Sequence, residues 1–151
     1  MYKRILVPVD GSDTATRGLQ EAIGLAADLK AKLILLHVID DFPLLVEMAS
    51  AINVEATLDE LRRRGEGLLA QGQAKAQERG VQAETLLRQV AGGRVADQIV
   101  HEALQADCEL IVMGTHGRRG FSHLLIGSEA ESVLRSSPVP VLLLRLRPTP
   151  V

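Results

Sequence analysis

The chain has 151 residues, of which 46% are hydrophobic, 24% are charged and only 2% are aromatic, and its formal net charge is −2. This length and composition fit one domain spanning residues 1–151 with an aliphatic core, and the near-neutral charge argues against a nucleic-acid-binding surface. Cys108 is the single cysteine, which excludes a disulfide framework and a paired-cysteine metal motif and fits a reducing compartment.

The first predicted element is a strand from Ile5 to Val9 that ends at Asp10. This apolar run is too short for a secretion signal, and no later segment reaches the roughly 18 uninterrupted apolar residues that suggest a membrane span. We therefore expect a cytoplasmic protein that does not contact membranes. A helix is predicted next, from about Asp13 to Lys30, with Ser12 as its N-terminal cap.

A second apolar run, Leu33 to Ile39, predicts a second strand. The segment Asp40–Glu55 that follows it is too apolar for a solvated linker. Two interpretations remain open: it covers a ligand mouth or a partner surface, or it forms a short helix that completes the core.

A long helix is predicted after this segment, ending near Gly80. Gly65, Gly67 and Gly72 each weaken such a helix by about 1 kcal/mol relative to Ala, so we expect it to be kinked or locally soft. The three consecutive arginines at 62–64 lie within it, with acidic residues at helical spacing on either side. We interpret them as a solvated helix face rather than a basic patch.

The second half of the chain continues the alternation of strand and helix. Strands are predicted at Ala83–Val90 and Leu110–Met113, with a helix around Ile99 between them and another around Val133 after them. Most of the strands are continuously apolar, as in a parallel sheet covered on both faces. The pattern predicts a doubly wound α/β fold with right-handed crossovers.

The last predicted strand, Val139–Leu144, follows Pro138 and is interrupted by Pro140. Proline cannot donate a ladder hydrogen bond, so we expect this strand at an edge of the sheet. An exposed apolar edge needs to be covered, and a second copy of the same strand across a two-fold axis would cover it. We therefore expect a homodimer through Val139–Leu144.

Two loops are candidates for a ligand site, because ligands of parallel sheets bind beyond the carboxyl ends of the strands. The first, residues 8–12, reads Pro-Val-Asp-Gly-Ser; the second is the glycine-rich run from Met113 to Ser128. Glycines before a helix allow main-chain N–H groups to gather around an anion, which indicates a phosphate-bearing ligand. The Walker pattern and the dinucleotide Gly-x-Gly-x-x-Gly pattern are both absent.

With these loops, the run His37-Val38-Ile39-Asp40 and the closing Ser137-Pro138-Val139-Pro140-Val141-Leu142, the chain resembles the universal stress proteins over essentially its whole length. The spacing Gly114-x-x-Gly117-x9-Gly127-Ser128 is similar to that of the ATP-binding branch of the family. The resemblance implies a Rossmann-like fold whose five-stranded parallel sheet has the order 3-2-1-4-5, with helices on both faces.

The resemblance also implies the residues that contact the nucleotide. They are Pro8, Val9, Asp10, Val38, Met113, Gly114, His116, Gly117, Gly127, Ser128 and Glu129. Asp10 would lie beside the adenosine and share Mg²⁺ or Mn²⁺ with the phosphates, and Val38 would meet the adenine through its backbone. Pro8 would shape the adenine pocket.

In the second loop, the resemblance implies that Met113 and Gly114 line the ribose and that His116 lies near the ribose or phosphates. Gly117, Gly127 and Ser128 would gather the phosphates.

Ser128 and Glu131 also form the pattern of a capping box, which is compatible with phosphate binding at the same helix start. Glu129 departs from the family, which commonly has a small apolar residue there. A carboxylate beside the terminal phosphate repels it unless a cation intervenes or the side chain turns to solvent.

The function expected is that of an ATP-binding regulator or sensor in the stress response, with AMP and ADP as alternative ligands. No catalytic residue is expected. The alternatives are a slow ATPase or a related adenylyl-transfer enzyme, and a nucleotide-free interaction module. Against transfer, the first loop lacks the Ser-Gly-Gly-x-Asp-Ser pattern of that class, and against efficient hydrolysis, no Lys is placed near the phosphates.

Overall fold

The computed structural model describes residues 1–41, 54–116 and 126–146, and its core is a five-stranded sheet in the order β3-β2-β1-β4-β5. The strands are β1 (Arg4–Pro8), β2 (Lys32–Asp40), β3 (Ala83–Val90), β4 (Leu110–Gly114) and β5 (Val141–Leu144). The helices are α1 (Asp13–Leu29), α3 (Val54–Glu78), α4 (Val95–Gln105) and α5 (Ser128–Ser136). All four strand pairings are parallel. The predicted fold class and strand order are confirmed.

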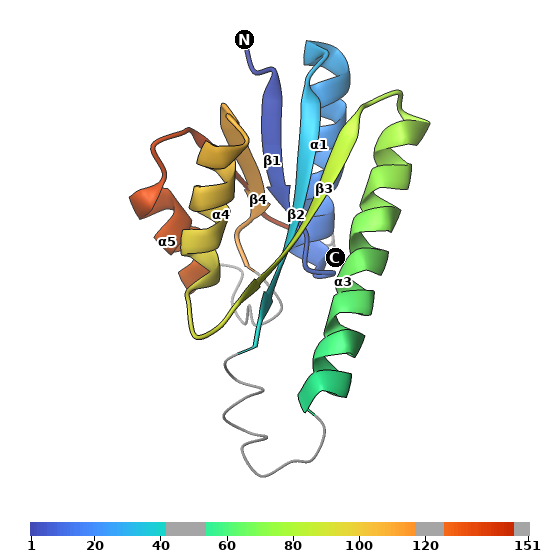
Figure 1. Ribbon diagram of the computed structural model, residues 1–151. Coiled ribbons are helices and arrows are strands. Elements are labelled where there is room, and N and C mark those ends of the chain that lie inside the picture. Colours follow the sequence, from blue (N-terminus) through green and yellow to red (C-terminus); the bar gives the residue numbers. More distant parts are fainter. Residues whose placement is uncertain (42–53, 117–125, 147–151) are drawn as a thin grey trace, which may run out of the picture.

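The central strand β1 explains why its sequence is continuously apolar. Ile5, Leu6 and Val7 are each 0% exposed, because helices cover both faces of the sheet. Ile5 and Val7 join the core under α1 and α3, whereas Leu6 joins the core under α4 and α5. Figure 1 shows the two helix pairs on opposite faces of the sheet.

Helix α1 begins and ends at local signals in the sequence. The Ser12 side chain accepts a hydrogen bond from the Ala15 N–H group at 3.2 Å, as predicted for a cap. At the other end, Lys30 adopts a left-handed conformation with φ of 55°, and its N–H group bonds back to the Ala26 carbonyl.

Helix α3 runs for 25 residues through the three glycines that were expected to soften it. Two of them face the sheet: a Cβ at Gly72 would lie 3.0 Å from Leu35 Cδ1, and one at Gly65 would overlap His37. Gly67 is exposed, and a Cβ there would meet nothing within 4 Å. The first two glycines therefore allow close packing of the helix on the sheet, a role that the helical propensity alone did not indicate.

Strand β5 lies at the sheet edge, as predicted, but begins at Val141 rather than at Val139. Pro140 precedes the strand, and its carbonyl accepts a hydrogen bond from the Ile111 N–H group at 3.0 Å. The prediction that a proline interrupts this strand was wrong, because Pro140 lies just before the strand. Pro140 contributes only its carbonyl to the pairing, so its missing N–H group breaks no hydrogen bond of β5.

Across the described ranges, none of the helices is both long and apolar enough to span a bilayer. Cys108 lies in the core just before β4 and is 4% exposed. Burial raises the pKa of its thiol to about 11, so the uncharged form is favoured.

Candidate functional site

The sheet order places the beginnings of the two candidate loops side by side. β1 lies between β2 and β4, with Leu6 paired to Ile34 on one side and Ile111 on the other. The loops after β1 and β4 therefore leave neighbouring carboxyl ends, which is where ligands of parallel sheets bind. The expectation that these two loops face each other is consistent with this order.

The loop after β1 is held by its own polar groups. The Ser12 N–H group donates to Asp10 Oδ1 at 2.9 Å, and Gly11 between them has a φ of 82°. This positive φ favours glycine because it has no Cβ. The turn places the Asp10 carboxylate at the start of α1, where the helix dipole favours negative charge.

His37 supports the same loop from β2. Its Nδ1 atom lies 2.7 Å from the Val9 carbonyl oxygen, and because a carbonyl only accepts, Nδ1 carries the proton and donates. Val9 is also held by its N–H group, which donates to the Leu36 carbonyl at 2.8 Å. Pro8 lies at the end of β1, and Val38, one residue after His37, is paired with Arg88 of β3. No pattern in the sequence indicated this role of His37.

The residues at the end of β4 are closely packed, although the sequence suggested that Gly114 belongs to an open glycine-rich loop. Met113 is 5% exposed, and its side chain belongs to the core under α4 and α5. Gly114 faces the first turn of α1, where a Cβ would lie 2.7 Å from the backbone carbon of Thr14. Gly114 is therefore required for the contact of α1 with β4, independently of any ligand.

Two hydrogen bonds connect the loops and the start of α5. The Thr14 hydroxyl donates to the His116 carbonyl, joining the start of α1 to the loop after β4. The Gly127 N–H group donates to the Thr115 carbonyl at 2.7 Å, which ties the start of α5 to the same loop. Gly117, predicted to contact phosphate, lies outside the described residues. Thr14 was not singled out from the sequence.

The start of α5 differs from the predicted capping box. Gly127 is the N-cap residue, and it makes no side-chain cap hydrogen bond, while Ser128 is the first helical residue and is exposed. The Glu131 N–H group bonds to the Gly127 carbonyl at 2.9 Å. The helix begins one residue earlier than the box requires, so the first-turn N–H groups have no acceptor from a capping side chain.

Glu129 lies at this edge near two other acidic residues. Burial, and to a smaller extent the negative charges of Asp10 and Asp40, raise the pKa of its carboxyl group to about 7. Residues from three separate segments therefore place carboxyl groups near one another. From the sequence, the Glu129 carboxylate was expected near a terminal phosphate. The sequence did not indicate that this carboxylate is partly buried or that Asp10 and Asp40 lie near it.

Among the described residues, neither the imidazoles nor the carboxylates build a metal centre by themselves. In the ranges 1–41, 54–116 and 126–146, no group of three or more His, Cys, Asp or Glu side chains is arranged to hold a metal ion. The structure does not test the predicted role of Asp10 as a ligand of Mg²⁺ or Mn²⁺.

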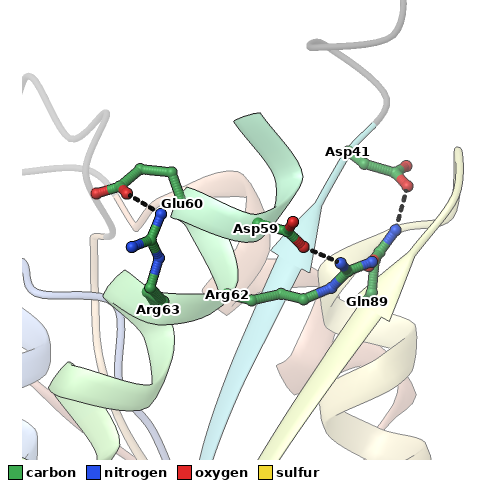
Figure 2. Close-up of polar contacts among 6 residues, drawn as sticks. All are labelled: Asp41, Asp59, Glu60, Arg62, Arg63 and Gln89. Carbon is green, nitrogen blue, oxygen red and sulfur yellow. Dashed lines mark hydrogen bonds and ion pairs between the residues drawn. The ribbon is translucent and has the colours of Figure 1, made fainter. Parts of the chain in front are cut away.

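A chain of polar contacts lies at the ends of β2 and β3, beside the point where the described chain stops at residue 41 (Figure 2). Gln89 donates to Asp41 Oδ2 at 2.8 Å and accepts from Arg62 at 3.0 Å. Arg62 also pairs with Asp59 within α3. The contact of Arg62 with Gln89 joins α3 to β3, and Gln89 extends the connection to Asp41 after β2. Most of the segment Asp40–Glu55 lies outside the described residues, and its two interpretations stay open.

The arginine run behaves as predicted for a solvated helix face. Arg62 pairs with Asp59 at 2.8 Å, and Arg63 pairs with Glu60 at 3.1 Å on the neighbouring side of α3 (Figure 2). All four of these side chains are at least 45% exposed, so the pairs contribute little to stability.

Comparison with known proteins gives one consistent result. The model of the universal stress protein family matches residues 1–145. Universal stress protein YxiE of Bacillus subtilis is 32% identical over 96% of this chain and 100% of its own length. A family structure from Burkholderia pseudomallei is 34% identical with a TM-score of 0.77, covering 96% of this chain and 97% of that one. A universal stress protein solved in complex with cAMP is 26% identical with a TM-score of 0.64, covering 95% and 97%.

Proposed function

The chain belongs to the universal stress protein family, and from that premise we propose that it binds an adenine nucleotide and acts as a nucleotide-dependent regulator of the stress response. The observation that carries the proposal is the hydrogen bond from Thr14 to His116, which holds the start of α1, directly after the first candidate loop, against the beginning of the loop after β4 at the carboxyl edge of the sheet. The similar protein solved in complex with cAMP supports an adenine-containing ligand.

The adenosine end of the site is proposed at the loop after β1. Asp10 is held at the start of α1 by the Ser12 N–H group, and the Val9 carbonyl is fixed by His37. Both contacts restrict the main chain that would meet the base and ribose. Pro8, the last residue of β1, and Val38, two residues before the end of the neighbouring β2, complete this end of the proposed site.

The phosphate end is proposed at the start of α5. Gly127 caps the helix without a side chain, which leaves the N–H groups of Ser128 and Glu129 available to an anion. Gly117, outside the described residues, is proposed to contribute to the same phosphate contacts. Gly114, Met113 and His116 would contribute main-chain atoms around the ribose. Asp10 would hold Mg²⁺ or Mn²⁺ together with the phosphates, and the cation would offset the negative charge of Glu129.

Isothermal titration calorimetry with Mg-ATP, Mg-ADP and AMP tests the proposal. We expect binding of at least one of the three by the wild-type chain and a loss of binding in Gly127→Val, because a Cβ at 127 already lies 3.0 Å from the Thr115 carbonyl oxygen. Gly67→Ala, whose added Cβ meets nothing within 4 Å, is the matched control and should bind normally. Absence of binding by the wild type at millimolar nucleotide would overturn the proposal.

We assign no catalytic residue to the site. A regulator holds its nucleotide, so phosphate release from bound ATP is expected to stay below about 1 s⁻¹, the low end of ordinary enzymes. Single-turnover release from radiolabelled ATP measures it directly, and faster turnover would favour the ATPase alternative. The buried thiol of Cys108 is compatible with the cytoplasmic location that we propose.

A homodimer through β5 is proposed as the working assembly. β5 is an edge strand; Leu142 within it and Leu146 just after it are 38% and 39% exposed. Apolar edges of this kind are normally covered by another strand. Leu142→Lys should shift the sedimentation coefficient from dimer to monomer, whereas Leu104→Lys, at a site on α4 that is 49% exposed, should leave it unchanged.

A further inference from the structure

We infer that Thr14 is a positioning residue of this site, which sets the nucleotide affinity by holding the loop after β4 against the start of α1. The inference rests on the proposed function, because it concerns how the same site is held in its binding geometry. Thr14 is not among the residues that the family resemblance places in contact with a nucleotide.

The contact joins parts of the chain that are far apart in sequence. Thr14 is the second residue of α1 and is 8% exposed, and its hydroxyl donates to the main-chain carbonyl of His116, 102 residues later. Through this bond a side chain of α1 reaches the loop after β4. It therefore constrains how those two segments sit relative to each other.

Packing fixes Thr14 on its other side. A Cβ at Gly114 would lie 2.7 Å from the backbone carbon, the Cβ and the Oγ1 of Thr14. One turn further along α1, a Cβ at Gly18 would lie 3.4 Å from the Gly114 nitrogen. The first two turns of α1 are thus in close contact with β4, and the Thr14 hydroxyl also lies 3.5 Å from Ser12 Oγ of the first loop.

The effect of this bond extends to the start of α5. His116 follows Thr115, whose carbonyl accepts from the Gly127 N–H group and whose own N–H group donates to the Leu144 carbonyl at 2.9 Å. A shift of the main chain at His116 is therefore passed through Thr115 to Gly127. Gly127 caps the helix whose first-turn N–H groups are proposed to bind phosphate.

The hydroxyl group, rather than the shape of the side chain, carries this role. Thr14→Val keeps the volume and the branched Cβ but removes the donor, leaving the His116 carbonyl without it. Thr14→Ser keeps the donor and loses only a methyl group. The loss of one buried hydrogen bond in a binding site corresponds to about a tenfold change in affinity.

The test compares four proteins by nucleotide titration calorimetry: wild type, Thr14→Val, Thr14→Ser and the matched control Thr16→Val. Thr16 is also in the first turn of α1, but its hydroxyl donates to the Ser12 carbonyl at 3.0 Å and not to the other loop. We expect Thr14→Val to weaken binding about tenfold. Thr14→Ser should recover most of the affinity, and Thr16→Val should bind as the wild type does.

Thermal unfolding of the nucleotide-free proteins separates positioning from a merely structural role. If Thr14→Val and Thr16→Val lower the unfolding temperature alike and neither changes the dissociation constant, Thr14 acts only in folding and the inference is overturned. The inference is supported when the two variants are similarly stable and only Thr14→Val loses affinity.

Amide hydrogen exchange at Gly127 distinguishes failure of this inference from failure of the proposed function. Without nucleotide, Thr14→Val should exchange the Gly127 amide several-fold faster than Thr16→Val does. If the wild type binds no nucleotide, the proposed function fails, and this exchange rate still decides whether Thr14 holds the loop. An unchanged rate at Gly127 overturns the inference whatever the titration shows.

Discussion

Gly65 of α3 lies directly against the imidazole ring of His37 on β2: a Cβ at position 65 would be 2.6 Å from His37 Cδ2 and 2.9 Å from Leu87 Cδ1. The same imidazole donates through Nδ1 to the Val9 carbonyl. Gly65 leaves room for the His37 ring, and His37 holds the Val9 carbonyl. A glycine in the middle of a helix therefore helps to fix the main chain just before Asp10.

Gly65→Ala should destabilise the protein by about 1–3 kcal/mol, because the added methyl group overpacks the contact with His37. Gly67→Ala is the matched control two residues later, where an added Cβ meets nothing within 4 Å. That variant should gain about 0.5–1 kcal/mol from helix propensity. Urea unfolding at constant pH measures both free energies, and equal responses of the two glycines would contradict the packing role of Gly65.

Glu129→Gln should change how stability depends on pH. The folded-state pKa of Glu129 is raised to about 7 from 4.5, so between these values the unfolded chain binds fewer protons than the folded one. Stability contributed by the neutral carboxyl is therefore present at low pH and is lost as pH rises through 7. The amide stays neutral, so Glu129→Gln should be more stable than wild type at pH 8, by on the order of 2 kcal/mol, and similar at pH 4.

Thermal unfolding at pH 4, 6 and 8 follows this difference. Glu131→Gln is the control, because Glu131 is exposed and pairs with Arg135 at 2.7 Å on the surface of the same helix. Its effect should stay below about 1 kcal/mol at every pH. A Glu129→Gln curve parallel to the wild-type curve would show that this carboxyl does not titrate near neutrality.

Gln89→Leu should destabilise the ends of β2 and β3 by about 2 kcal/mol, because Asp41 is 3% exposed and its Oδ2 atom accepts from Gln89. Its Oδ1 atom is buried and has no partner in the described part of the chain, so the carboxylate would lose its donor from β3. Adding Asp41→Asn to Gln89→Leu should recover part of the loss, because a neutral amide is less costly to bury than a carboxylate. Chemical denaturation of the single and double variants measures this coupling.

The matched control for that pair is Gln77→Leu, which adds the same apolar group at an exposed position of α3. It should change the unfolding free energy by less than about 0.5 kcal/mol. If Gln89→Leu is equally neutral, the contacts drawn in Figure 2 contribute nothing to stability.

Gly114→Ala should be more damaging than its small size indicates, by about 3 kcal/mol, because the new Cβ overlaps the backbone of Thr14 and not a flexible side chain. Gly24→Ala in α1, where a Cβ meets nothing within 4 Å, should instead stabilise by about 0.5–1 kcal/mol. Differential scanning calorimetry of the nucleotide-free proteins compares them. If Gly114→Ala has little effect on stability, the packing role of Gly114 is contradicted, and contact with a ligand would be the remaining reason for this glycine.

The strands and their order were predictable because buried parallel strands are continuously apolar and because the motifs match a family of known fold. The first loop was predictable for the same reason: Asp10 and Ser12 are local signals, and the structure forms the expected cap at Ser12. What the sequence did not indicate depends on partners from distant elements. From the sequence, Gly65 is only a residue that weakens its helix. Its packing role becomes visible when the structure places His37 opposite it.

The errors have the same origin. Ser128 and Glu131 satisfy the capping-box pattern, but the bond of Gly127 to Thr115 fixes the chain one residue earlier, and the helix begins there. Val139 was assigned to the last strand, although the pairing of β4 with β5 starts from Ile111 and Val141. Local patterns cannot supply such tertiary constraints, because they contain no information about the residue that lies opposite.

The burial of Cys108 turns the chain's single thiol into a reporter of its own opening. With its pKa at about 11 and 4% of its surface exposed, the folded protein should react with a thiol reagent only when α4 and β4 separate. The labelling rate then measures how often the face under α4 and α5 opens, without any engineered probe. A nucleotide that binds at the start of α5 should lower the labelling rate of Cys108, and the decrease should grow with the fraction of protein that is bound.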